Sequence, residues 1–90
     1  MAPEELKELL EKNDYNPMHE GNHIGPGIKI INKYLPKVGI TAANDNQVWF
    51  CNAEELCNAG LIKEDALILA EHNFMIDKDA ISLFVDSFKN

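Results

Sequence analysis

The chain lacks arginine altogether and has only eight lysines against fifteen aspartates and glutamates, which gives a net charge of −7 over 90 residues. Without guanidinium groups, the chain cannot make the bidentate contacts by which arginine recognises phosphate or guanine. Residues 1–27 carry six acids and two lysines (−4), and residues 41–90 carry nine acids and three lysines (−6). Only residues 28–40 are basic, through Lys29, Lys33 and Lys37 (+3). Direct binding to nucleic acid is therefore not expected.

Cysteines and long apolar runs are also scarce. Cys51 and Cys57 are too few for a disulfide framework, and their spacing fits neither a zinc knuckle nor a redox pair. We expect them to be buried thiols. No stretch approaches the length of a membrane span, and the first residues show no signal-peptide pattern. These absences predict a soluble, cytoplasmic protein that has no membrane partner.

The three histidines include one motif-like string, His19-Glu20-Gly21-Asn22-His23. On a helix, two histidines four positions apart and the glutamate between them form the core of a zinc protease. Here glycine and asparagine occupy the middle positions, prolines flank the segment, and no apolar helical period runs through it. We therefore expect a loop without a metal site. A metal-binding protein or metal-dependent enzyme that uses His19 and His23 is the alternative function.

Other catalytic signatures are missing as well. Gly21, Gly25 and Gly27 lack the spacing and the preceding strand of a nucleotide-binding loop. No serine, threonine or cysteine carries a sequence signature of an activated nucleophile. We expect no cofactor, no catalytic residue and no enzymatic activity.

Periodicity and turn residues predict a single α+β domain over residues 1–90, with about five short helices and one β-hairpin near residues 38–51. Asn52 and Glu55 have the spacing of a helix N-cap pair, and Gly60 is the natural stop of that helix. The predicted helices span residues 3–13, 26–35, 53–59, 63–73 and 78–88.

The last of these predicted helices has the clearest period, because Ile81, Phe84, Val85 and Phe88 recur at helical spacing. We expect Ile81, Phe84 and Val85 in the core. Together with helix 63–73 this segment resembles a helix-turn-helix in length, which makes a DNA-binding protein a further alternative. Asp77 and Asp79 at the start of the second helix would meet the DNA first, which argues against that function.

Trp49 is the main clue to an interaction surface. Strand alternation places Val48 and Phe50 on one face of the hairpin and Trp49 with Cys51 on the other. The tryptophan is then either covered by residues 14–25 or displayed as an anchor for another chain. A lone hairpin also has free edges, which invite pairing with a second copy of the chain.

The composition thus favours a small acidic protein-interaction module, a regulator or inhibitor that binds a basic protein surface and imitates the charge of nucleic acid. The partner surface is expected to use Trp49 as an anchor and acidic residues of the C-terminal half as steering charges. These predicted binding residues are Trp49, Glu54, Glu55, Glu64 and Asp65.

Overall fold

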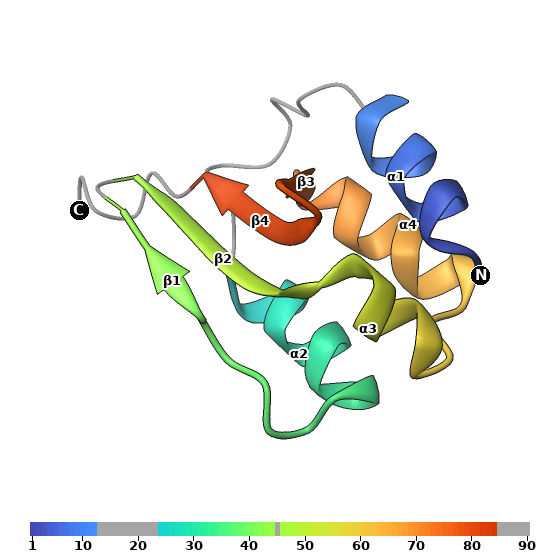
Figure 1. Cartoon of the computed structure of the whole chain (residues 1–90), viewed down its shortest axis with the longest axis horizontal. Coiled ribbons are helices and arrows are strands. Elements are labelled where there is room, and N and C mark those ends of the chain that lie inside the picture. Colours follow the sequence, from blue (N-terminus) through green and yellow to red (C-terminus); the bar gives the residue numbers. More distant parts are fainter. Residues whose placement is uncertain (13–23, 45, 85–90) are drawn as a thin grey trace.

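The computed structural model describes residues 1–12, 24–44 and 46–84, and these form four helices and four strands (Figure 1). The α+β class is confirmed. The described elements share one hydrophobic core. None of the described helices is both long enough and apolar enough to cross a membrane. The elements in chain order are α1 (Pro3–Lys12), α2 (Ile24–Tyr34), β1 (Ala42–Ala43), β2 (Gln47–Asn52), α3 (Ala53–Asn58), α4 (Lys63–Glu71), β3 (Met75–Asp77) and β4 (Ala80–Phe84).

The strands form one antiparallel sheet in the order β1-β2-β4-β3. The predicted hairpin is confirmed as β1 and β2, although its first strand has only two residues and the hairpin belongs to a larger sheet. Val48 and Phe50 point into the core as expected. Cys51 is buried too, although alternation put it on the other face, because the register shifts between Trp49 and Asn52.

The predicted helix over residues 78–88 is wrong. Residues 80–84 form β4, which pairs with both β2 and β3. Lys78 and Asp79 connect β3 to β4 with φ values of 51° and 68°, which is the two-residue turn that joins antiparallel strands with the correct twist. Without a second helix, the helix-turn-helix interpretation of residues 63–88 is wrong as well.

The strand conformation buries only some of the side chains that the helical period places in the core. Ile81 is fully buried, as predicted. Phe84 is 43% exposed, so its assignment to the core is wrong. A strand places residues 81 and 84 on opposite faces, whereas a helix would place them on the same one. Val85 and Phe88 lie outside the described residues.

Local signals did define the ends of α3. Asn52 accepts a hydrogen bond from the Glu54 N–H (2.8 Å), and the Glu55 carboxylate accepts one from the Asn52 N–H (3.3 Å), which completes the expected capping box. After the helix, Gly60 has a φ of 106°, and its N–H and that of Leu61 donate back to the last turn. This Schellman arrangement explains why the helix ends there.

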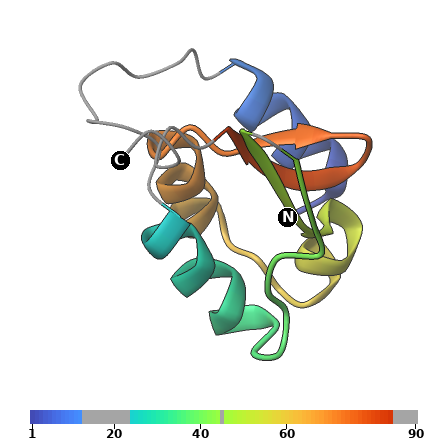
Figure 2. The same cartoon turned by 90° about the vertical axis from the view of Figure 1, so that its left-hand side faces the viewer.

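The same motif ends α4 and positions Phe74. Asn73 has a φ of 66°, and the Phe74 N–H donates to the Leu69 carbonyl at 3.0 Å. The buried Phe74 ring then packs against Phe50 of β2, with ring centroids 5.7 Å apart, and against Gly27 of α2. Figures 1 and 2 show α2 and α4 side by side next to the sheet. The Phe74 ring thus contacts both α2 and β2.

A substitution at Gly27 tests the packing of α2 against Phe74. A Cβ at Gly27 would overlap the Phe74 ring, so the ring or α2 must shift to accept it. We expect Gly27→Ala to destabilise the protein by roughly 1–3 kcal/mol through overpacking, despite the better helix propensity of alanine. Gly25 is the matched control, because nothing lies within 4 Å of its Cβ position.

Gly25→Ala should change stability by no more than about 0.5 kcal/mol, since Pro26 crowds the residue before it and offsets the propensity gain. Urea unfolding followed by tryptophan fluorescence measures both variants. Equal effects at the two glycines would contradict the close packing of α2 on Phe74.

Candidate functional site

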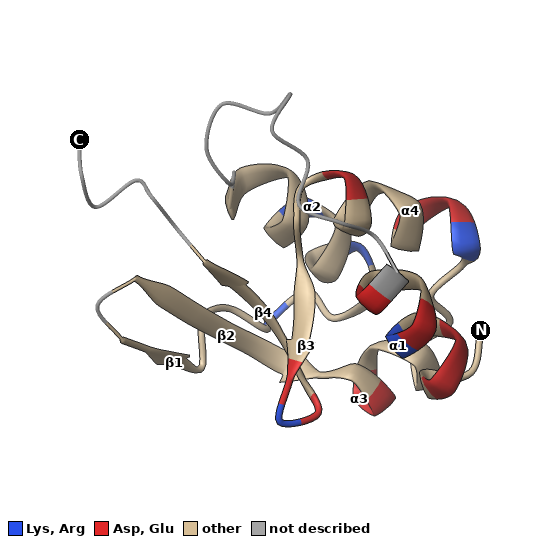
Figure 3. Ribbon diagram, turned by 90° about the horizontal axis from the view of Figure 1, so that it is seen from above, with Lys and Arg blue, Asp and Glu red and all other residues tan. Residues whose placement is uncertain are grey.

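An open cavity of about 320 Å³ lies where the N-terminal turns of α1 and α3 meet the β3–β4 turn. Its lining includes Glu4, Lys7, Asn52, Glu54, Ile76 and Asp79. We call it the acidic pocket, because three carboxylates and one ammonium group surround it. Figure 3 shows acidic residues on α1, on α3 and at the β3–β4 turn, which is the same end of the molecule.

Backbone interactions bring these distant segments together. The Ala53 N–H at the start of α3 donates to the Asp79 carbonyl at 2.9 Å, which joins the helix to the β3–β4 turn. On the third side, α1 contacts both α3 and β3. The acidic residues at the helix starts, Glu4 and Glu54, also interact favourably with the helix dipoles.

The chemistry of the acidic pocket suits a cation. Glu4, Glu54 and Asp79 are exposed, so water and dissolved ions screen the attraction between their carboxylates and a cationic ligand. Within residues 1–12, 24–44 and 46–84, no three histidine, cysteine or acidic side chains are placed to hold a metal ion. An organic cation, such as a lysine or arginine side chain, is the chemical class that this pocket fits. The predicted metal ligands His19 and His23 lie outside the described residues.

The lining of the acidic pocket includes one of the five predicted binding residues. Of these residues, Glu54 lines the acidic pocket, and the carboxylate of the neighbouring Glu55 caps α3. Glu64 is exposed in the first turn of α4 and is not part of the pocket lining. Trp49 and Asp65 form side-chain hydrogen bonds with other parts of the fold. The structure adds Glu4 and Asp79, which sequence reasoning did not select.

Trp49 lies on the sheet face opposite the core and is half-buried. Its indole N–H donates to the Asp77 carboxylate at 2.9 Å. Beside it, the Gln47 amide donates to the Ser82 hydroxyl at 2.8 Å, and that hydroxyl donates to the Val48 carbonyl at 2.9 Å. These bonds connect β2, β4 and β3, so the indole N–H has a structural role in the sheet.

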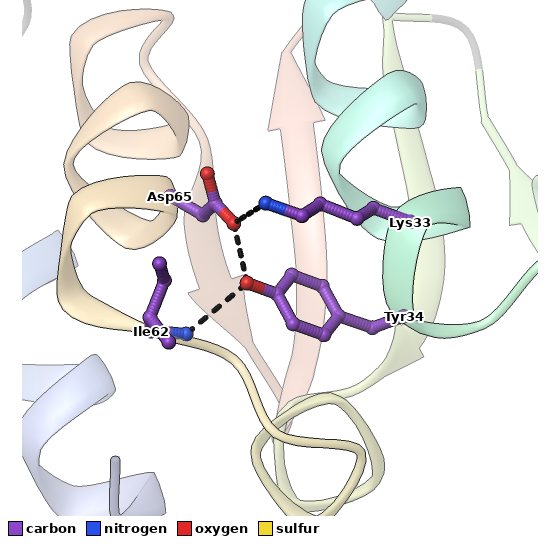
Figure 4. A network of polar contacts seen from close by, with 4 residues as sticks. All are labelled: Lys33, Tyr34, Ile62 and Asp65. Atoms are coloured by element: carbon purple, nitrogen blue, oxygen red, sulfur yellow. Dashed lines mark hydrogen bonds and ion pairs between the residues drawn. The ribbon is translucent and has the colours of Figure 1, made fainter.

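Asp65 is buried and joins α4 to α2 (Figure 4). Its carboxylate accepts hydrogen bonds from the Tyr34 hydroxyl and from the Lys33 ammonium group, the latter at 2.8 Å. The Tyr34 hydroxyl also accepts a bond from the Ile62 N–H at 3.3 Å. The Lys33 bond, followed by the Tyr34 bond, lowers the pKa of Asp65 below its usual 3.8. Asp65 therefore supports the fold and is withdrawn from the candidate partner surface.

The two partners of Asp65 should differ in their contribution to stability. The Tyr34 bond is partly buried, whereas the Lys33 side chain is 57% exposed. We expect Tyr34→Phe to destabilise the protein by roughly 1.5–3 kcal/mol, because it removes a hydrogen bond to a charged group. Lys33→Ala should cost about 1 kcal/mol or less, as for a solvent-screened pair.

The stabilisation from the lowered pKa of Asp65 is present above pH 3.8 and is lost as the pH falls through the folded-state value. Urea unfolding at pH 7 and at pH 3 measures both variants. If Lys33→Ala is the more damaging change at pH 7, or if the loss in Tyr34→Phe does not shrink at pH 3, this assignment of roles is wrong.

Both cysteines are free and buried, as the sequence predicted. Burial, assisted by the charge of Glu55, raises the pKa of Cys51 from its usual 9.0 to about 11. Burial raises the pKa of Cys57 as well. The thiolate form that metals and oxidants need is therefore suppressed in the folded protein.

This burial can be measured with Ellman's reagent in a Cys57→Ala variant, which leaves Cys51 as the only thiol. At pH 8 we expect Cys51 to react about 100-fold or more slowly in the native protein than in urea, from the difference in thiolate fraction alone. The reciprocal Cys51→Ala variant should show slow native reaction of Cys57. Equally fast reaction with and without urea would contradict the burial.

In three comparisons, the chain matches no protein-family model, no curated protein and no solved structure. Function is therefore inferred from the residues themselves. The strongest candidate site among the described residues is the acidic pocket, since it combines a cavity with three carboxylates from separate elements.

Proposed function

We propose that this protein is a small acidic interaction module that binds a basic surface of a partner protein through the acidic pocket. The observation that carries the proposal is the convergence of Glu4, Glu54 and Asp79 on one open cavity. The net charge of −7 and the lack of arginine support it, because such a molecule attracts cationic surfaces from a distance.

The role proposed for this module is that of a regulator or inhibitor. A basic protein surface that ordinarily binds nucleic acid carries the positive charges that the acidic pocket attracts, so binding here would compete with nucleic acid by imitating its charge. Two free thiols suit a reducing compartment, and we propose the cytoplasm as the location.

The backbone of the β3–β4 turn adds support. Lys78 and Asp79 both have positive φ, a conformation that costs most residues with a Cβ about 1–2 kcal/mol, that aspartate tolerates better, and that glycine adopts freely. A carboxylate at position 79 is thus kept at some cost in stability, and it lines the acidic pocket. Use of Asp79 in binding would account for that arrangement.

The test removes one charge at a time without changing shape. Asp79→Asn retains a residue that tolerates positive φ, and its matched control is Glu64→Gln, an exposed acid outside the pocket lining. With a lysine- and arginine-rich peptide as the probe, we expect Asp79→Asn to weaken binding about five-fold or more, and Glu64→Gln less than about two-fold. Titration calorimetry measures both.

A triple variant, Glu4→Gln with Glu54→Gln and Asp79→Asn, should abolish binding, and rising salt should weaken binding of the unmodified protein. Equal losses for Asp79→Asn and Glu64→Gln would mean that net charge alone attracts the peptide. In that case the acidic pocket is not the site.

A further inference from the structure

Among the described strands, none pairs with the outer edge of β1, which is the last strand on its side of the sheet. Every residue from Gly39 to Asn44 is exposed. Only alternate backbone groups of an edge strand point toward its neighbour, so β1 presents N–H and C=O groups to solvent. The opposite edge differs, because α1 contacts β3 there.

Residues 38–44 also lack the features that usually protect such an edge. The stretch Val38-Gly39-Ile40-Thr41-Ala42-Ala43-Asn44 contains no charged residue and no proline. Ile40 is 46% exposed and has high β-propensity. Lysines, prolines and bulges are the ordinary means of preventing edge-to-edge pairing, and only the shortness of β1 limits it here.

We infer that the β1 edge pairs with the β1 edge of a second copy of this chain, in antiparallel orientation about a two-fold axis. Such a contact is self-complementary, with Ile40 of each copy beside the edge of the other. It joins the two four-stranded sheets into a continuous sheet. This inference does not rest on the proposed function, because it uses neither the acidic pocket nor its residues.

The distribution of charge selects a second copy as the occupant. Figure 3 shows β1 and β2 without charged residues, while the acidic residues of α1 and α3 lie at the other end of the molecule. Two copies that meet at β1 therefore keep their acidic ends apart, beyond the screening length of about 8 Å at physiological salt. A basic partner would instead be drawn to the acidic ends.

The test is sedimentation equilibrium of the full chain from about 10 µM to about 1 mM, a range suited to a small interface. We expect the average mass to rise with concentration toward twice the monomer mass. Ile40→Lys should weaken association ten-fold or more, although it lowers the net negative charge. Ile62→Lys is the matched control, since Ile62 is 47% exposed directly before α4, and it should leave association unchanged.

Ala42→Lys, a second exposed edge position, should act like Ile40→Lys, and urea unfolding checks that both variants fold. Because the acidic ends lie far apart, rising salt should leave dimerisation nearly unchanged, whereas it should weaken binding of a basic peptide, so the two proposals fail separately. A mass that stays monomeric to 1 mM overturns the inference, as does a loss of association in Ile62→Lys but not in Ile40→Lys.

Discussion

The packing of Phe74 against Gly27 connects the helices to the sheet. Phe74 follows the Schellman turn of α4, lies beside the Phe50 ring of β2, and occupies the space that a Cβ at Gly27 would need. Because interiors are close-packed, this single ring sets how near α2 can lie to both α4 and β2. The bond network of Asp65 and Tyr34 then joins the same two helices near the C-terminal end of α2.

Features of the fold that depend on local chemistry could be predicted from the sequence. Asn52 with Glu55, and Gly60 eight residues after Asn52, define α3 because caps act within a few residues. The helical period of Ile81, Phe84 and Val85 predicts a helix over residues 78–88. Their strand conformation depends on pairing with β2, some thirty residues earlier, and the Lys78–Asp79 turn contains neither the asparagine nor the glycine that signals such a turn.

The residues that line the acidic pocket could not be predicted from the sequence, for a related reason. Charge can be read from the sequence, but exposure depends on tertiary contacts. Asp65 and Glu64 are neighbours in the first turn of α4, yet Asp65 is buried against Tyr34 and Glu64 faces solvent. Glu54, predicted as a steering charge, is exposed and lines the acidic pocket. Its companions Glu4 and Asp79 come from elements whose proximity no local pattern indicates.

The incorrectly assigned segment is also the one that completes the acidic pocket. As a helix starting near residue 78, the chain would have carried Asp79 as an ordinary first-turn acid. As a tight turn, it presents the Asp79 carbonyl to the Ala53 N–H and places the residue beside the N-terminal turn of α3. The pairing of β4 with β2 therefore helps to hold Asp79 beside the start of α3. A substitution that weakens this strand pairing should therefore alter the acidic pocket even when no pocket residue is changed. The reason is that the hydrogen bond from the Ala53 N–H to the Asp79 carbonyl connects the end of the sheet to the pocket.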